Sequence, residues 1–256
     1  MDAGDILAMK QYLAWLVQAP EHMSHLSDGQ VSELLWQRHP RRRFIKQVAK
    51  GACLLDIGAG SGGLAAWKEG EPRRADIRLF GVDQRMGEHA ALYEAWEVVN
   101  LDTGKPRFPG IRFDAFYASH LIEHLASPDD LVQYMACVAN ERAEVYFEWP
   151  SPKTQFFPTS VAFEHETGLH VLPLNFFDDH THKATFDIGT VSAMLARSGF
   201  ETVESGEIDL GEIAIEHMAR GKRLGGGWFG TGLWSIVGWA SYVHAQRRGD
   251  TASIGG

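Results

Sequence analysis

Three glycines follow an aspartate at regular spacing near residue 60. Asp56 ends a short apolar run, and Gly58, Gly60 and Gly62 come after it. Glycine adopts positive φ without strain and lets a ligand approach the backbone closely. If a helix follows, its first N–H groups point at that ligand. The pattern therefore predicts a buried strand, a glycine-rich turn and a helix that together bind a small ligand.

A second acidic residue follows the next apolar run, residues 77–82. Asp83 lies 20 residues after Gly63, a spacing at which an acid accepts hydrogen bonds from ribose hydroxyl groups. Ligands of such sheets bind at the carboxyl ends of the strands. Gly63 also completes the pattern Gly58-x-Gly60-x-x-Gly63, which is typical of dinucleotide-binding proteins. The glycine spacing alone therefore leaves a dinucleotide ligand open.

The sequence of residues 56–62 resembles the first motif of the class I (Rossmann-like) S-adenosylmethionine-dependent methyltransferases. Residues 81–83 are similar to the second motif, and residues 194–201 are similar to the family's last helix and its turn into the sixth strand. The resemblance covers residues 50–220 and implies a small-molecule methyltransferase with S-adenosylmethionine as its cofactor. The alternatives are a nicotinamide-dependent oxidoreductase and a non-catalytic cofactor-binding scaffold with an interaction tail.

The resemblance assigns cofactor contacts to residues that follow four of the expected strands. These residues are Asp56, Gly58, Ala59, Gly60, Gly62, Asp83, Gln84, Asn100, Leu101, Asp102, Ser119 and His120. In this assignment the glycine-rich turn binds the methionine portion of the cofactor, and Asp83 binds the ribose. Either Asn100 or Asp102 takes the place of the acid that contacts the adenine. The alternative role for Asp102 is to stabilise the turn beside residues 103–104.

Residues 113–125 resemble the fourth strand of small-molecule methyltransferases and the turn after it, where a Glu-His-Leu ending is common. Ser119 and His120 come at the carboxyl end of this strand, so the resemblance places them near the methionine portion and the methyl group. A hydroxyl acceptor is a poor nucleophile that needs a base, and His120 is one catalytic candidate. Glu123 and His124 either face the same cleft or fix the turn and cap the next helix.

A long insertion, residues 151–189, follows the expected fifth strand. A connection of this length in a compact domain is usually functional, so we expect it to build much of the acceptor pocket. Its histidines and aspartates are His165, His170, Asp178, Asp179, His180 and His182. His180 is the second candidate for a general base. The group's other roles are hydrogen bonding and metal binding, but the spacing matches no strong ligand motif and no metal is predicted.

The composition is that of an ordinary globular protein: 256 residues, 45% hydrophobic and 22% charged, with a net charge of −9. The negative charge argues against a nucleic acid partner. The resemblance implies a small-molecule or glycan acceptor, which we expect to be methylated at oxygen, and a protein acceptor stays open. The basic residues Arg41, Arg42 and Arg43 are expected to lie on a solvated helix face. No secretory signal is apparent, which favours the cytoplasm.

Strands and helices alternate from residue 52 onward, which predicts an α/β fold. We expect a Rossmann-like, mostly parallel seven-stranded sheet with an antiparallel last strand, helices on both faces and an N-terminal helical cap. Among the expected elements are a helix over residues 86–96 and the last strand over residues 213–218. The predicted segments are a cap (1–50), a methyltransferase domain (51–220, with the acceptor-site insertion 151–189) and a C-terminal extension (221–256).

The C-terminal extension is rich in glycine and contains Trp228, Trp234 and Trp239. It is long enough to span a bilayer, but its glycines and polar residues weaken a spanning helix. Tryptophans followed by Arg247 and Arg248 suit an interfacial helix better. We expect the extension to pack on the chain's own domain or on a second subunit, and contact of residues 224–246 with a membrane surface is the alternative.

Overall fold

A computed structural model describes residues 3–18, 25–225 and 227–248. The chain divides into two compact units, each built from segments that are far apart in the sequence. We call them the helical unit (Met1–Pro40, Pro150–Thr185 and Glu207–Ser241) and the sheet unit (Arg41–Trp149, Phe186–Gly206 and Tyr242–Gly256).

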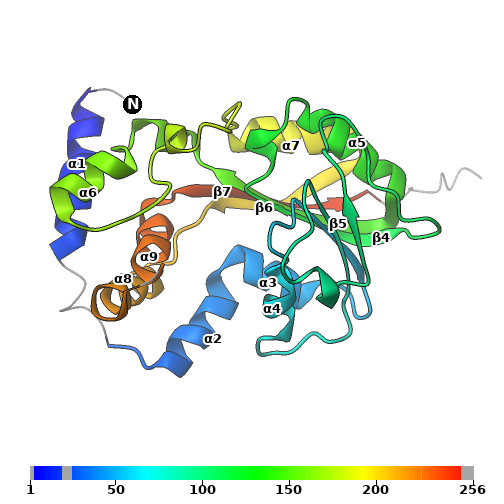
Figure 1. Cartoon of the computed structure of the whole chain (residues 1–256), viewed down its shortest axis with the longest axis horizontal. Helices are drawn as coiled ribbons and strands as arrows, with labels where there is room; N and C mark the ends of the chain where they lie inside the picture. Colours follow the sequence, from blue (N-terminus) through cyan, green and yellow to red (C-terminus); the bar gives the residue numbers. More distant parts are fainter. Residues whose placement is uncertain (1–2, 19–24, 226, 249–256) are drawn as a thin grey trace, which may run out of the picture. The chain divides into compact units, whose positions relative to one another are not determined.

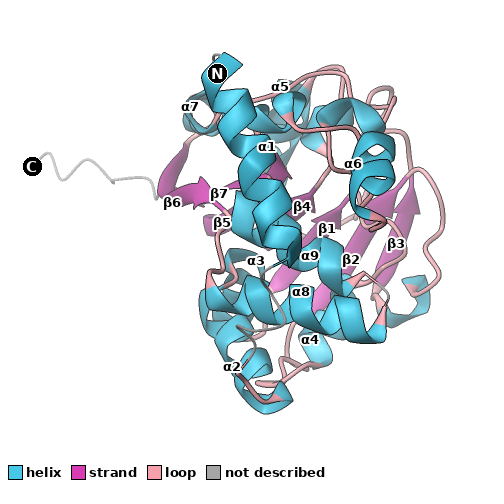
Figure 2. Ribbon diagram, turned by 90° about the vertical axis from the view of Figure 1, so that its left-hand side faces the viewer, coloured by secondary structure: helices cyan, strands magenta, loops and turns pink. Residues whose placement is uncertain are grey.

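The sheet unit contains a seven-stranded sheet with the strand order β3-β2-β1-β4-β5-β7-β6 (Figure 2). The strands are β1 (Cys53–Ile57), β2 (Arg78–Asp83), β3 (Ala95–Val98), β4 (Phe113–Ser119), β5 (Ala139–Pro150), β6 (Phe200–Glu207) and β7 (Ala240–Arg247). The pairs β1–β2, β1–β4, β2–β3 and β4–β5 are parallel, and β7 is antiparallel. The central strands β1 and β4 are almost entirely buried, as near-continuous apolar runs predict.

Helices cover both faces of this sheet. Figure 1 shows α5 (Pro128–Val138) and α7 (Ile188–Arg197) on one face, with α3 (Pro40–Gln47) and α4 (Leu64–Glu69) on the other. α5 begins with proline followed by two acids, a sequence that favours a helix N-terminus. It buries Leu131, Val132 and Met135 in the core of the sheet unit. The predicted Rossmann-like fold class is confirmed.

The helical unit contains most of the N-terminal region, the insertion and part of the predicted extension. Its helices are α1 (Ala3–Gln18), α2 (Asp28–Arg38), α6 (Ser160–Thr167), α8 (Glu212–Leu224) and α9 (Trp228–Val237), with short 3₁₀ turns η4 (Pro152–Phe156) and η5 (Phe176–Asp178). At the start of α2, Ser27 and Gln30 form a reciprocal capping box. The boundaries of the three predicted segments stay predictions.

The predicted position of the last strand is wrong. Residues 213–218 belong to α8, whose buried residues include Ile213, Ala214, Met218 and Gly221, at the spacing of one helix face. The last strand is β7, which forms from residues within the predicted C-terminal extension. The glycine and tryptophan content of the extension conceals this strand. In the sequence β7 directly follows α9, a helix of the helical unit, so the segment reads as one continuous tail.

The helix predicted over residues 86–96 is also wrong. These residues form the 3₁₀ turn η2 (Ala90–Leu92) and the start of β3. A Cβ atom at Gly81 of β2 would lie 2.4 Å from Cε3 of Trp96. The indole therefore packs over β2 because residue 81 has no side chain. Strand pairing with β2 and this packing outweigh the helical periodicity of the segment.

Helices α8 and α9 approach closely through two glycines. A Cβ atom at Gly221 would lie 2.3 Å from the Phe229 nitrogen, and one at Gly232 would lie 2.4 Å from the Ala214 carbonyl oxygen. We expect Gly221→Ala to lower the free energy of unfolding by about 1–3 kcal/mol, measured by urea denaturation. Gly227→Ala is the matched control, because a Cβ there meets no atom within 4 Å. Equal stability of the two variants would contradict the packing argument.

Two tryptophans of the predicted extension form hydrogen bonds inside the helical unit. Trp234 Nε1 donates to the Pro173 carbonyl at 2.8 Å, and Trp239 Nε1 donates to the Leu174 carbonyl at 2.7 Å. Within residues 3–18, 25–225 and 227–248, no helix combines the length and apolar character needed to cross a bilayer. Trp234 lies in α9, so its contact supports the expected packing of this helix on the chain's own domain.

Candidate functional site

The glycine-rich turn after β1 has the backbone conformation that its sequence predicts. Gly58, Gly60 and Gly62 have φ values of 70°, 56° and 86°, which only glycine adopts without strain. The amides of Gly58 and Ala59 donate to the Val82 carbonyl at 2.9 and 3.0 Å, so β2 fixes the start of the turn. A Cβ atom at Gly60 would meet nothing within 4 Å, which leaves open space above the turn.

Asp83 is held against this turn at the carboxyl end of β2. Its Oδ2 accepts from the Gly60 amide at 2.9 Å, and its Oδ1 accepts from the Arg85 amide at 3.2 Å. The Arg85 carbonyl in turn accepts from Trp96 Nε1 at 3.1 Å. The Asp83 side chain is half-buried and that of Gln84 is exposed. The structure thus brings the predicted ribose acid and the glycine-rich turn together.

Asp56 is buried beneath the turn and bonded to a tyrosine. Tyr93 Oη donates to Asp56 Oδ2 at 2.6 Å. Burial raises the pKa of the Asp56 carboxyl to about 7, although the hydrogen bond from Tyr93 opposes this rise. The ordinary pKa of an aspartate is about 4, so Asp56 carries a proton in the folded protein under mildly acidic conditions.

This raised pKa predicts a pH-dependent stability. Between about pH 4 and pH 7 the folded protein keeps a proton on Asp56 that the unfolded chain releases. The contribution of Asp56 to stability is therefore full below about pH 4 and falls as the pH rises to about 7. The difference in unfolding free energy between wild type and Asp56→Asn should fall on the order of 1 kcal/mol per pH unit. Urea denaturation from pH 5 to 8 measures it, and a pH-independent difference would contradict it.

The residues predicted at the adenine form a turn after β3. The Asp102 amide donates to Asn100 Oδ1 at 2.9 Å, and Asp102 Oδ1 accepts from the Ala126 amide at 2.8 Å. Asn100 and Asp102 are exposed, whereas Leu101 is half-buried and packs against the core of the sheet unit. The two polar side chains thus stabilise loops, and their contact with an adenine stays a prediction.

His120 directly follows β4 and has a φ of +55°, a conformation that is uncommon for residues other than glycine. Because Ile57 pairs with Ala118, the segment after β4 emerges beside the glycine-rich turn. A Cβ atom at Gly58 would lie 2.9 Å from Cδ1 of Leu121. The register therefore places the backbone of Ser119 and His120 next to the turn, as predicted for neighbours of the cofactor.

Two carboxylates flank the His120 imidazole. Its Nε2 lies 3.2 Å from Glu148 Oε1, and its Nδ1 lies 3.6 Å from Glu123 Oε1. Burial disfavours the charged imidazole, but the side chains of Glu123 and Glu148 outweigh burial and raise the pKa of His120 to about 9. His120 is therefore mainly a cation at neutral pH, paired with the two acids.

Glu148 is the centre of a buried polar network at the carboxyl end of β5. Arg41 Nε donates to Glu148 Oε2 at 3.1 Å, and Tyr146 Oη donates to the same oxygen at 2.7 Å. The Arg41 side chain is 19% exposed, so its predicted place on a solvated helix face is wrong. The Glu148 carboxylate raises the pKa of Arg41 further, although burial opposes the charge. The guanidinium stays charged.

Arg41 and Glu148 were not among the predicted site residues, but the sequence contains a signal for one of them. Glu148 is an acid near the carboxyl end of an apolar strand, the same kind of position that identifies Asp56 and Asp83. Arg41 lies 107 residues from Glu148 in a run of three arginines, and nothing local distinguishes it from Arg42 and Arg43.

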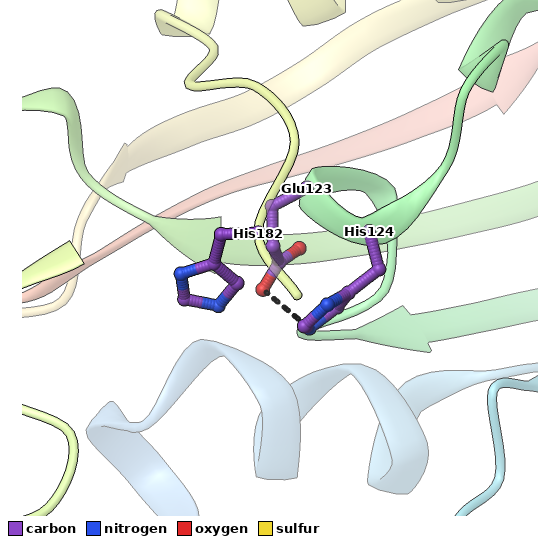
Figure 3. Close-up of side chains that lie close together, drawn as sticks. All are labelled: Glu123, His124 and His182. Carbon is purple, nitrogen blue, oxygen red and sulfur yellow. Dashed lines mark ion pairs between the residues drawn. The ribbon is translucent and has the colours of Figure 1, made fainter. Parts of the chain in front are cut away.

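Glu123 and His124 belong to the 3₁₀ turn η3 (Ile122–His124). Figure 3 shows the Glu123 carboxylate beside the His124 ring, and Oε1 and Nε2 are 4.0 Å apart. Glu123 is completely buried, whereas His124 is half-buried. Glu123 also faces His120, so it takes part in the polar network as well as in the turn.

The histidines and aspartates of the insertion lie in the helical unit, where several of them fix loops. Asp178 Oδ2 accepts from the amides of Leu174 and Asn175 at 2.9 and 2.7 Å. His182 Nδ1 lies 2.6 Å from the Phe176 carbonyl oxygen. His180, the second predicted base, is exposed after η5. The insertion residues with these contacts support the hydrogen-bonding role, and a catalytic role for His180 stays a prediction.

The arrangement in the sheet unit fits a nucleoside cofactor with a methionine portion. The turn places no side chain over Gly60, as close approach of a ligand to the backbone requires. The Asp83 carboxylate at the end of β2 suits the two hydroxyl groups of a ribose. Because β1, β2, β3 and β4 are parallel, the residues that follow these four strands all lie at the same end of the sheet.

Residues 30–205 match the family model described as "Methyltransferase domain". This match covers more than half of the chain, and the chain belongs to the methyltransferase domain family. The prediction of an S-adenosylmethionine-dependent methyltransferase is thereby confirmed, and the nicotinamide-dependent oxidoreductase and the non-catalytic scaffold are not supported. No curated protein matches the chain significantly.

Several solved structures share the fold at low sequence identity. An S-adenosylmethionine-dependent methyltransferase from Mesorhizobium loti is 18% identical with a TM-score of 0.56, and the match covers 84% of this chain and 98% of that one. A putative methyltransferase from Haloferax volcanii, in complex with the Trm112 activator, is 14% identical with a TM-score of 0.55 (86% and 95% covered). Phosphoethanolamine N-methyltransferase 2 from Haemonchus contortus, in complex with S-adenosyl-L-methionine, is 14% identical with a TM-score of 0.53 (91% and 56% covered).

Proposed function

We propose that this methyltransferase transfers the methyl group to a hydroxyl group of a small molecule or glycan, with His120 as the general base. One observation carries the proposal: the His120 ring lies 3.2 Å from Glu148, directly after β4 and beside the glycine-rich turn. A histidine that is oriented by a carboxylate is a common general base. The alternative base is His180, which is exposed in the helical unit.

In this proposal the residues of the sheet unit bind and orient the cofactor. The turn from Gly58 to Gly62 receives the methionine portion, Asp83 accepts from the ribose hydroxyl groups, and residues 100–102 contact the adenine. The cofactor supplies an activated methyl group on a positively charged sulfur. The chain's main contribution is alignment of the acceptor oxygen with that methyl group, since a held geometry lowers the entropic part of the barrier.

The proton of the acceptor hydroxyl group passes to His120 Nε2 in this scheme, because Nδ1 is buried and faces Glu123. A pKa of about 9 makes the neutral imidazole scarce at pH 7 but strongly basic when present. Glu148 and Glu123 then stabilise the imidazolium that forms. Arg41 holds Glu148 in place through its Nε. Arg41 is thus a positioning residue.

The net charge of −9 supports a small molecule or glycan over a nucleic acid as the acceptor, because the phosphate backbone would be repelled. A membrane-surface or subunit contact through residues 224–246 remains part of the proposal. Leu224 and Trp228 support it, since they are 74% and 47% exposed. Residence in the cytoplasm also stays a prediction.

Calorimetric titration of the whole chain with S-adenosylhomocysteine, with NADH as the parallel ligand, tests the cofactor site. We expect saturable micromolar binding of the first ligand and none of the second. A panel of paired hydroxyl and amine acceptors, assayed for S-adenosylhomocysteine release, then tests the acceptor. NMR of the product locates the new methyl group. Methylation confined to amines would overturn the proposal of an oxygen acceptor. Loss of turnover in His180→Asn but not in His120→Asn would show that His180, and not His120, is the general base.

A further inference from the structure

A pocket lies in the sheet unit near the amino-terminal ends of β4 and β5, at the end of the sheet opposite to His120. It has a volume of about 620 Å³, a size typical of small-molecule sites. Its lining consists of Arg112, Ala139, Asn140, Glu141, Arg247 and Arg248. Arg112 precedes the first residue of β4, and Ala139 begins β5. Because β4 has seven residues, the two ends are about 20 Å apart, and a ligand here cannot reach the groups around His120.

Two guanidinium groups meet at one backbone oxygen in this pocket. Arg112 Nη2 donates to the Ala139 carbonyl at 3.1 Å, and Arg247 Nη1 donates to the same carbonyl at 2.8 Å. Arg247 Nη1 also donates to the Ala136 carbonyl at 3.0 Å, in the last turn of α5. This second bond gives Arg247 a structural role as a cap for the helix C-terminus, but Arg112 makes no such contact with the helix.

The two positive charges have little compensation. Within the part of the chain that the structure describes, no carboxylate lies within 4.0 Å of the guanidinium of Arg112 or Arg247. Arg248 adds a third guanidinium, whose Nε is 3.5 Å from Glu201 with both side chains 66% exposed. Glu141 is the acid among the six lining residues. Like charges that share one carbonyl repel each other, and a bound anion would relieve that repulsion.

We propose that this pocket binds a small molecule that bears phosphate groups. The bonds described above use Nη2 of Arg112 and Nη1 of Arg247. Each side chain therefore keeps its Nε–H group and its second Nη as donors for a ligand. The planar guanidinium matches phosphate oxygens in a two-point geometry, and Arg248 supplies charge at the exposed side. Asn140 Nδ2 already donates to Asp114 Oδ1 at 2.6 Å. The recognition therefore rests on the arginines.

Titration calorimetry of the full chain with pyrophosphate, at fixed ionic strength in potassium chloride, tests the proposal. We expect saturable binding to one site, weakened at least tenfold in Arg112→Gln and in Arg247→Gln. The matched control is Arg73→Gln, an exposed arginine paired with Glu69, which should bind pyrophosphate like the wild type. Because Arg247 also caps α5, a circular dichroism melt accompanies each variant. If Arg247→Gln fails to fold, Arg112→Gln decides the result.

Three outcomes would overturn the proposal: unchanged binding in Arg112→Gln, equal weakening in Arg73→Gln, or binding of heparin without binding of pyrophosphate. The same variants are titrated with S-adenosylhomocysteine, whose affinity we expect to stay within threefold of wild type. The pocket and the methyl-transfer site are therefore tested separately. Failure of one proposal leaves the measurement of the other intact.

Discussion

The variant His120→Asn is expected to turn over at least about 100-fold more slowly than the wild type, the usual range for loss of a general base. Asparagine tolerates positive φ better than most residues, so the +55° backbone at this position is preserved while the imidazole is lost. Because burial and the two carboxylates set the pKa of His120 at about 9, wild-type kcat/KM should rise about tenfold per pH unit from pH 6 to 8. The variant should lose this dependence.

The control for this experiment is His25→Asn, which changes an exposed histidine of the helical unit. Its turnover and pH profile should equal those of the wild type. A conventional assay of S-adenosylhomocysteine release over pH 6–10 provides both readouts. A His120→Asn enzyme that keeps more than half of the wild-type rate would remove the base from the proposal. An unchanged pH profile with a reduced rate would reassign His120 to positioning.

The arrangement of the glycine-rich turn and Asp83 could be predicted from the sequence because its information is local. Asp56 and the glycines at 58, 60 and 62 form one continuous segment, and their backbone conformation follows from the absence of side chains. Asp83 ends the neighbouring strand, and the parallel register of β1 and β2 brings it to the turn. A motif and the rule for parallel strands were sufficient for these contacts.

The polar network around His120 is not local in this sense. Arg41 reaches Glu148 across 107 residues. The bond from Tyr93 to Asp56 beneath the glycine-rich turn is likewise not local, since it spans 37 residues. Such pairs depend on which helix or loop covers which strand, and that choice is made by packing of the whole unit. Arg41 differs from its neighbours Arg42 and Arg43 only in the direction in which its side chain leaves α3. The charge pattern therefore could not separate it from them.

The errors in the fold have a similar cause. Residues 213–218 are apolar enough for a strand, yet they form α8, whose glycine at 221 allows close packing against α9. Residues 240–247 look like the end of a tryptophan-rich tail, yet they form β7 between β5 and β6. In both cases a partner that is distant in the sequence decides the secondary structure, as tertiary context does for weak propensities.

Replacing Asp83 with alanine is expected to weaken the binding of S-adenosylhomocysteine at least tenfold. Two losses combine in this variant. The carboxylate that is proposed to accept from the ribose hydroxyl groups disappears, and the Gly60 amide loses its acceptor at 2.9 Å. A hydrogen bond that involves a charged group contributes about 1.5–3 kcal/mol, and each 1.4 kcal/mol corresponds to a factor of ten in affinity. Calorimetric titration at pH 7.5 measures the effect.

The conservative variant Asp83→Asn separates the two losses. Its side-chain oxygen can still accept from the Gly60 amide, so the turn keeps its conformation, but the negative charge that suits a diol is gone. We expect affinity between those of wild type and Asp83→Ala. Asp129→Ala, which removes an exposed carboxylate paired with Arg197, is the control and should bind like the wild type. If Asp83→Asn bound as tightly as the wild type, Asp83 would act only by holding Gly60, and the ribose contact would have to be assigned to another residue.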